Sequence, residues 1–293
     1  MVMSILESIL LGLVQGITEF LPVSSSGHLA ILQNVFHIKT DGGMLFDILL
    51  HVGTLVAVFI VYRKDILRMI VEAICMCMDS FQNGKTFLHN RKHDDALRYK
   101  KVVHNNYRKF VLLVIVSTIP TGIIGYAAKS LVAAASMTLV IPGVCLLLTG
   151  VLLLVSDISE DGHKIPKTVS YSNGFIIGIC QGIATLPGLS RSGTTIAACL
   201  LSGFDRKFAV KYSFIMSIPA ILGAAVLELK DIGKETITFS QFGIYLIGAI
   251  VAGVVGYVCM KTMLVVVRKK KFKGFAFYCF AVGIFAIVAH FVF

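Results

Sequence analysis

Six long apolar stretches constrain this chain more than any other feature of its sequence. Between them lie polar segments, and each stretch is about as long as the roughly 20 residues that a helix needs to cross a bilayer. The chain is 56% hydrophobic and 15% charged, whereas a soluble domain is about 45–50% apolar and about 25% charged. We therefore expect an all-α polytopic membrane protein with six transmembrane helices. The expected spans are 44–62, 110–128, 137–155, 211–229, 242–260 and 274–293.

Two further hydrophobic regions, 4–36 and 172–204, are interrupted near their middle by Pro, Gly and hydroxyl residues. The helical pieces on either side are only about 11 to 17 residues long, which is too short to span a membrane at a rise of 1.5 Å per residue. Irregular backbone at membrane depth is tolerated where it lines a cavity inside the protein. Each region is therefore predicted to form a re-entrant helix–loop–helix segment.

The two interrupted regions resemble each other. Residues 12–28 read GLVQGITEFLPVSSSGH, and residues 178–195 read GICQGIATLPGLSRSGTT. Each copy is followed by three expected spans, and because three is odd, the second copy must insert upside down. The sequence thus predicts an inverted repeat with halves 1–160 and 161–293. In such proteins the functional site lies near the midplane, where the two breaks meet.

Positive charge gives the expected orientation. The chain has 27 Lys and Arg residues against 16 Asp and Glu, and cytoplasmic loops of membrane proteins are enriched in Lys and Arg. This bias places the basic loop 63–109 in the cytoplasm and both chain termini outside. The run at 268–271 is interpreted as a topology anchor beside anionic lipid, so nucleic acid is not expected as a partner. Loop 63–109 has mixed charge, and no function is assigned to it.

The first break carries candidate chemical groups. Gln15 and Glu19 are four residues apart, so they share one face of a helix. Ser24, Ser25, Ser26 and His28 follow the helix-breaking Pro in the sequence PVSSSGH. Taken alone, the serines are explained as helix caps and His28 as a ring that bonds a backbone carbonyl.

The second break adds Ser190, Arg191, Ser192 and Thr195. A helix N-terminus with hydroxyls and an arginine beside it is suited to phosphate, because the backbone amides and the guanidinium fork both bind anions. Ionisable groups at membrane depth are costly and therefore functional candidates. A purely structural ion pair between Glu19 and Arg191 is the alternative explanation.

Other titratable residues have weaker claims. Asp47 and His51, which are four residues apart at the start of a span, are lesser candidates to face the same cavity. His290 is expected at a membrane interface. The remaining histidines are expected in solvated loops, and they are His89, His93, His104 and His163.

The motifs QGITEFLPVSSSGH and LPGLSRSGTT resemble the two signature motifs of the undecaprenyl-diphosphatases, bacterial integral membrane enzymes linked to bacitracin resistance. The resemblance extends over essentially the whole chain, including the segment FDILLHVGTLVAV. In the family's first motif, written (Glu/Gln)-x-x-x-Glu, this chain has Gln15 with Glu19. The stretch Ser24 to His28 matches the next part, and the PGxSRSxxT motif is matched from Pro187 to Thr195.

The resemblance implies hydrolysis of undecaprenyl diphosphate to undecaprenyl phosphate at the outer face of a bacterial cell membrane, which recycles the carrier for peptidoglycan synthesis. It implies a divalent cation, Mg²⁺ or alternatively Ca²⁺, with Glu19 as the best ligand. Gln15 can add a carbonyl oxygen but removes one possible carboxylate. The expected partners are an isoprenoid diphosphate and membrane lipids, and a homo-oligomer is compatible with the sequence.

Two questions stay open at the level of sequence. His28 can attack phosphorus directly, activate Ser25 or activate water; His28 is favoured as nucleophile or base, with Ser25 as the alternative nucleophile. Arg191, Ser190, Ser192 and Thr195 are expected to hold phosphate oxygens. A flippase for the lipid carrier is the competing function, because inverted repeats with broken helices are typical of transporters. An ion channel is disfavoured, since neither motif supplies a ring of carbonyls or like charges.

Overall fold

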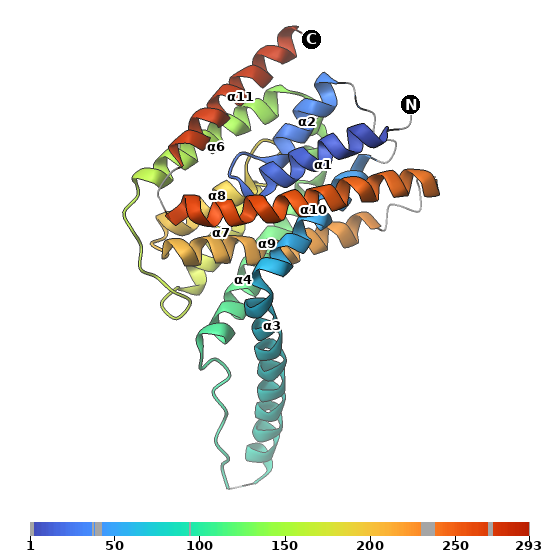
Figure 1. Cartoon of the computed structure of the whole chain (residues 1–293). Helices are drawn as coiled ribbons and strands as arrows, with labels where there is room; N and C mark the ends of the chain where they lie inside the picture. Colours follow the sequence, from blue (N-terminus) through green and yellow to red (C-terminus); the bar gives the residue numbers. More distant parts are fainter. Residues whose placement is uncertain are drawn as a thin grey trace.

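A computed structural model describes residues 3–36, 38, 43–93, 95–229, 238–268 and 272–292. Within these residues the chain is built from helices, most of them joined by short turns and two by longer segments, between α3 and α4 and between α6 and α7 (Figure 1). In chain order they are α1 (Ile5–Phe20), α2 (Ser25–Val35), α3 (Gly43–Lys92), α4 (Asn106–Ala127), α5 (Lys129–Ser136), α6 (Val140–Ile158), α7 (Tyr171–Ile183), α8 (Arg191–Leu201), α9 (Arg206–Leu229), α10 (Phe239–Arg268) and α11 (Lys273–Val292).

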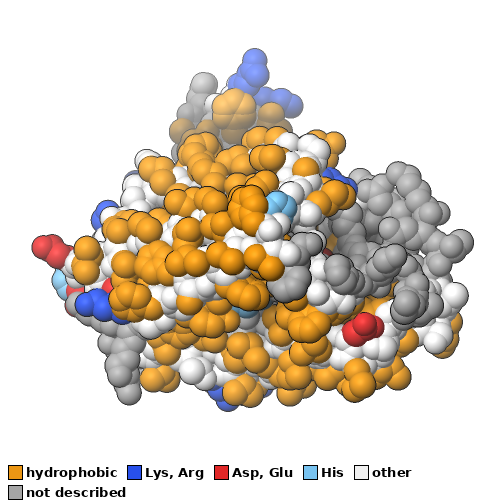
Figure 2. Space-filling model, turned by 90° about the horizontal axis from the view of Figure 1, so that it is seen from above, with side chains coloured by type: hydrophobic (Ala, Val, Ile, Leu, Met, Phe, Trp, Pro, Cys, Tyr) orange, Lys and Arg blue, Asp and Glu red, His pale blue; other side chains and the backbone are white. Residues whose placement is uncertain are grey.

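Six of these helices are long and apolar enough to cross a membrane, which confirms the predicted all-α polytopic class. They are α3, α4, α6, α9, α10 and α11. The third span begins a little later than predicted, because the short helix α5 precedes it. The face of the molecule in Figure 2 is covered mainly by hydrophobic side chains, with few charged ones among them. Such a surface is suited to lipid.

Both interrupted regions form two short helices separated by a turn. In the first region α1 ends at Phe20 and α2 begins at Ser25; in the second, α7 ends at Ile183 and α8 begins at Arg191. The serine before each second helix caps it, since its hydroxyl accepts a hydrogen bond from a backbone amide in the first turn. The breaks thus lie where the motifs predicted them. That these pairs are re-entrant, and that the two halves are inverted, stay predictions.

The first helix of each pair packs against a span of the other half. Helix α1 lies along α10, and α7 lies along α4 (Figure 1). Glycines allow these close contacts: a Cβ on Gly12 would lie 2.4 Å from the carbonyl oxygen of Gly248, and one on Gly178 would lie 2.2 Å from that of Ser117. The two halves are therefore held together by helices exchanged between them, which fixes the position of each break.

Helix α3 differs from the prediction of a loop over 63–109. It kinks at Tyr62, where φ is −103° and ψ is 17°, and then continues as a helix to Lys92. We call residues 63–105, the helical extension together with the segment that returns along it, the arm. In Figure 1 the arm projects from the body of the molecule, away from both marked chain ends. Only the return segment of the predicted loop is non-helical.

Arg108 at the start of α4 anchors the arm. Its guanidinium donates to Glu72 over 2.8 Å, to Asp79 over 2.6 Å and to the carbonyl oxygen of Val102 over 2.7 Å. These three acceptors belong to the helical extension and to the return segment. The carboxylates therefore have partners that are distant in sequence, which is why local charge alone made this region look like a loop.

We expect a Gly178→Ala substitution to lower the free energy of unfolding by about 1–3 kcal/mol, the usual effect of forcing an extra methyl group into a tight contact. The added Cβ meets backbone on α4, which cannot rotate away. The matched control is Gly122→Ala, where no heavy atom lies within 4 Å of the new Cβ. Thermal unfolding in one detergent, followed by circular dichroism, measures both. Equal effects in the two variants would contradict the close α4–α7 contact.

We also expect Arg108→Ala to speed deuterium exchange several-fold at amides of the return segment, because Arg108 links the Val102 carbonyl of this segment to Glu72 and Asp79 of the extension. Amide exchange read by mass spectrometry on peptides covering residues 95–105 tests this. A Lys109→Ala variant, which changes the neighbouring charge without touching these carboxylates, is the control. Unchanged exchange in Arg108→Ala would show that the segment is held by other contacts.

Candidate active site

Glu19, in the last turn of α1, lies at the centre of the site. Its side chain is only 4% exposed. One carboxylate oxygen, Oε2, accepts a hydrogen bond from the amide of Gln15 at 2.8 Å and another from the hydroxyl of Ser25 at 2.7 Å. The predicted shared face of Gln15 and Glu19 is therefore formed, and it carries a buried carboxylate in contact with a hydroxyl group.

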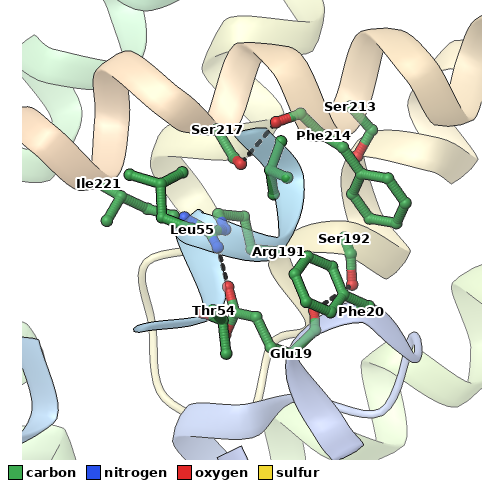
Figure 3. Close-up of a pocket in the computed structure, with 11 residues that line it drawn as sticks. Glu19, Phe20, Thr54, Leu55, Arg191, Ser192, Ser213, Phe214, Ser217 and Ile221 are labelled. Atoms are coloured by element: carbon green, nitrogen blue, oxygen red, sulfur yellow. Dashed lines mark hydrogen bonds and ion pairs between the residues drawn. The ribbon is translucent and has the colours of Figure 1, made fainter. Parts of the chain in front are cut away.

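Arg191, the first residue of α8, forms an ion pair with Oε1 of Glu19. Figure 3 shows the two side chains pointing toward each other from the two breaks. Ser192 adds a hydrogen bond from its hydroxyl to the backbone carbonyl of Glu19 over 3.2 Å. The Arg191 side chain is 23% exposed, so its guanidinium can also reach a ligand. The ion pair weighed as a structural alternative thus exists, and it lies inside the site.

The two turns touch each other beside this pair. A Cβ on Gly27 would lie 2.8 Å from the Cα of Gly188, which itself has a φ of +91°. Among the described residues other than glycine, only Ser24 has a positive φ, which is 69°. A left-handed backbone is costly for serine and is typically kept at functional sites. Here it ends the turn and places Ser25 at the start of α2.

A cavity of about 350 Å³ opens on these groups. It is lined by hydroxyl, carboxylate and guanidinium groups from both breaks, and by residues of α3, α4, α5, α7 and α9. Its polar lining includes Glu19, Ser24, Ser25, Ser26, Asp47, His51, Thr121, Ser136, Gln181, Thr185, Ser190, Arg191 and Ser192. A much smaller pocket of about 10 Å³ lies on another side of the ion pair and has room for roughly one water molecule (Figure 3).

The structure does not bring His28 into this cluster. Its Nδ1 lies 2.7 Å from the carbonyl oxygen of Ser24, and its Nε2 lies 2.8 Å from the hydroxyl of Tyr278 on α11. A carbonyl oxygen only accepts, so Nδ1 carries the proton and Nε2 accepts from the tyrosine. Both ring nitrogens are therefore engaged outside the cavity. The His28 ring bonds a backbone carbonyl, which is the role expected when this residue is considered alone.

His51 is brought close to Glu19 instead. Its Nδ1 lies 2.7 Å from the carbonyl oxygen of Asp47 and must donate to it. Its Nε2 lies 3.6 Å from Oε2 of Glu19. Sequence reasoning gave this residue little weight. The useful signal was the pair of polar residues four apart, Asp47 and His51, in a span that is otherwise apolar.

Two predicted binding residues have structural roles in this arrangement. Thr195 is fully buried, donates to the carbonyl oxygen of Arg191 over 2.8 Å and shares a hydrogen bond with Ser213 on α9. It does not line the cavity. Ser190 caps α8 by accepting from the amide of Gly193 over 3.1 Å, and it also lines the cavity. Sequence reasoning missed Ser213, although Ser213 and Ser217 lie four residues apart in an apolar helix.

The site offers few oxygen ligands for a divalent cation. Across the described residues, no three His, Cys, Asp or Glu side chains meet as a metal site. Mg²⁺, however, is usually held by one or two carboxylates together with substrate phosphates. Glu19 supplies one carboxylate, and the buried Oε1 of neighbouring Gln15 has no hydrogen-bond partner. The Glu19 carboxylate, which lines the cavity, fits a cation that takes its remaining ligands from a substrate. Gln15 presents its Nε2 to Glu19 and is not among the residues that line the cavity.

The arrangement as a whole is suited to phosphoryl chemistry. A hydroxyl that donates to a buried carboxylate can be deprotonated and act as a nucleophile. A guanidinium and two helix N-termini beside it stabilise the negative charge that develops on a phosphoryl group. The other histidines lie elsewhere: His290, His104 and His163 are exposed, while His89 and His93 stack on each other in the arm. Residues 269–271 of the basic run lie outside the described residues.

Comparison with known proteins shows the family to which the chain belongs. The sequence matches the family described as "Bacitracin resistance protein BacA" over residues 8–285. It is 40% identical to a protein named undecaprenyl-diphosphatase from Alkaliphilus metalliredigens, over 98% of both chains. Proteins of the same name from Desulforapulum autotrophicum and Methanosphaera stadtmanae are 40% and 38% identical, and each alignment covers at least 98% of either chain. The chain therefore belongs to the BacA family of bacitracin resistance proteins.

Proposed function

We propose that this protein hydrolyses undecaprenyl diphosphate to undecaprenyl phosphate and inorganic phosphate, as the names of its relatives indicate. The observation that carries the proposal is the Ser25 hydroxyl on the buried Glu19 carboxylate, with Arg191 on the other carboxylate oxygen. Such a site has the parts of a phosphatase. A transporter needs no activated hydroxyl, so hydrolysis is favoured over lipid flipping as the principal activity.

In the proposed reaction Ser25 is the nucleophile. Glu19 accepts the Ser25 proton as Oγ attacks the terminal phosphorus, the bridging P–O bond breaks, and undecaprenyl phosphate leaves. Water then attacks the phosphoserine, releases inorganic phosphate and restores the hydroxyl. Arg191, the Ser192 amide and the N-terminus of α2 stabilise the charge of the transferring phosphoryl group.

His51 is proposed to share the proton held by Glu19. An unprotonated Nε2 facing Oε2 can take up the proton that Ser25 releases and return it to the departing undecaprenyl phosphate. His28 is proposed as a positioning residue, since its bonds to Ser24 and Tyr278 hold the strained turn that precedes Ser25. This assignment replaces the preference for His28 as nucleophile or base.

A divalent cation, Mg²⁺ or Ca²⁺, would be held by Glu19 and would neutralise negative charge on the diphosphate. The Glu19 carboxylate at the cavity supports this position. Gln15 could add its amide oxygen only after its amide group turned over, because its Nε2 faces Glu19.

The protein is proposed to lie in the bacterial cell membrane with the cavity open to the outer face and both termini outside. Two features support this orientation. Most Lys and Arg residues lie in the loops that the positive-inside rule assigns to the cytoplasm. The basic arm also projects away from both chain ends (Figure 1). The substrate's isoprenoid chain would then remain in lipid while its diphosphate enters the cavity.

Phosphate release from a long-chain isoprenyl diphosphate by the purified protein in detergent, with Mg²⁺ or with chelator, tests the proposal. We expect Ser25→Ala and Glu19→Gln to lower kcat by about 10²–10⁴-fold, and Arg191→Ala by about 10²–10³-fold. Ser156→Ala, the same substitution at a buried serine of α6 far from the site, is the control and should retain activity. Full release by Ser25→Ala would rule out this nucleophile, and no release by the folded parent would rule out the function.

His51→Gln tests the proton-sharing role. We expect kcat to fall by about 10- to 100-fold, with KM changed by less than about threefold, because the ring contacts Glu19 rather than holding the phosphate. His163→Gln, in an exposed loop, should match the parent. If kcat of His51→Gln also matches the parent, the imidazole has no part in the reaction.

A further inference from the structure

The outer side of the arm carries an unpartnered apolar strip. Helix α3 beyond Tyr62 buries one side against the return segment, while large apolar side chains on the other side are half exposed or more. At about 100° per residue these side chains fall within about 120° of the helix circumference. The strip is made of Leu67, Ile70, Val71, Ile74, Met78, Phe81 and Leu88.

The exposed charges on the helical extension itself are all of one sign. Over residues 63–92, all of which the structure describes, each exposed charged side chain is basic. The three carboxylates of this range are instead half-buried on the side that faces the body and the return segment. Asp65 pairs with Lys211 at 3.0 Å, while Glu72 and Asp79 pair with Arg108. The exposed basic residues are Arg63, Lys64, Arg68, Lys85, Arg91 and Lys92.

An apolar strip flanked by Lys and Arg is the pattern of a helix that lies in the interface of a membrane containing anionic lipid. The same pattern disfavours a second copy of the arm as the occupant, because two such faces would bring like charges together. If this helix of 30 residues stood away from the membrane, it would extend about 45 Å into water and expose the strip to it. Exposed apolar patches of this length are rare in soluble regions.

The kink at Tyr62 turns the arm toward a direction in which it can lie along the membrane surface. Helix α3 changes course at Tyr62, and in Figure 1 the arm beyond it runs across the direction of the long helix α10. A segment that crosses the direction of a spanning helix in this way is placed to lie along the membrane surface. We propose that the arm is a peripheral membrane-binding element whose Leu67–Leu88 strip inserts into the interface of an anionic lipid leaflet. This proposal is independent of the catalytic one.

Because the sequence contains no tryptophan, the fluorescence of a single introduced tryptophan reports on its position alone. Phe81→Trp places the sole tryptophan in the strip, and Tyr99→Trp places it in the return segment on the opposite side of the arm. Full-length protein carrying either substitution is reconstituted into bilayers of phosphatidylcholine, with or without phosphatidylglycerol, that contain acyl-brominated lipid as a quencher. Circular dichroism that matches the parent confirms that each sample is folded.

We expect Phe81→Trp emission to be blue-shifted and quenched in the anionic bilayer and less so in the neutral one, while Tyr99→Trp is unquenched in both. Adding Lys85→Glu to Phe81→Trp should reduce the quenching, and higher salt should do the same. Lys167→Glu, an equal charge change at an exposed residue outside the arm, should leave it unchanged.

Three results would overturn the proposal. Phe81→Trp emission that matches Tyr99→Trp in both bilayers would show that water covers the strip. A blue shift without quenching by brominated lipid would show that another protein surface, such as a second copy, covers it. Equal quenching in neutral and anionic bilayers, unaffected by Lys85→Glu, would remove the role assigned to the basic residues.

Discussion

The ion pair between Glu19 and Arg191 is the interaction on which the rest of this structure depends. Each partner lies at the break of a helix pair, and the two breaks belong to different halves of the chain. A buried charge is costly when unpaired, so each of the two residues stabilises the other. The exchange of α1 and α7 between the halves holds the partners within reach.

The pair also explains how one carboxylate can serve several groups. Arg191 engages Oε1 and leaves Oε2 to Ser25 and Gln15, with His51 slightly farther away. The carboxylate is held as an anion by the arginine and is therefore able to receive a proton from the serine. The strained turn at Ser24 then fixes the hydroxyl in place. The ion pair that joins the two breaks therefore also prepares the Glu19 carboxylate to accept the Ser25 proton.

Much of this architecture could be predicted from the sequence, because it depends on length, period and repetition. The six spans, both breaks and the meeting of Glu19 with Arg191 followed from such patterns. The rotation of α2 about its axis did not. Ser25 and His28 are three residues apart and were expected to act together, yet Ser25 meets Glu19 while His28 turns to Tyr278. The arm was missed because its carboxylates are neutralised by Arg108 and Lys211, partners that no local pattern reveals.

The contact between the two turns has a consequence for how such a chain can change over generations. Gly27 and Gly188 approach so closely that neither has room for a side chain, and Gly188 also abuts the backbone of Pro142. A substitution in one turn therefore displaces the other, although the two are encoded far apart. The outward residues of the two motifs can therefore change independently, whereas the residues where the turns meet must change together. Recombination between distant relatives that separated the halves would be expected to break this fit first.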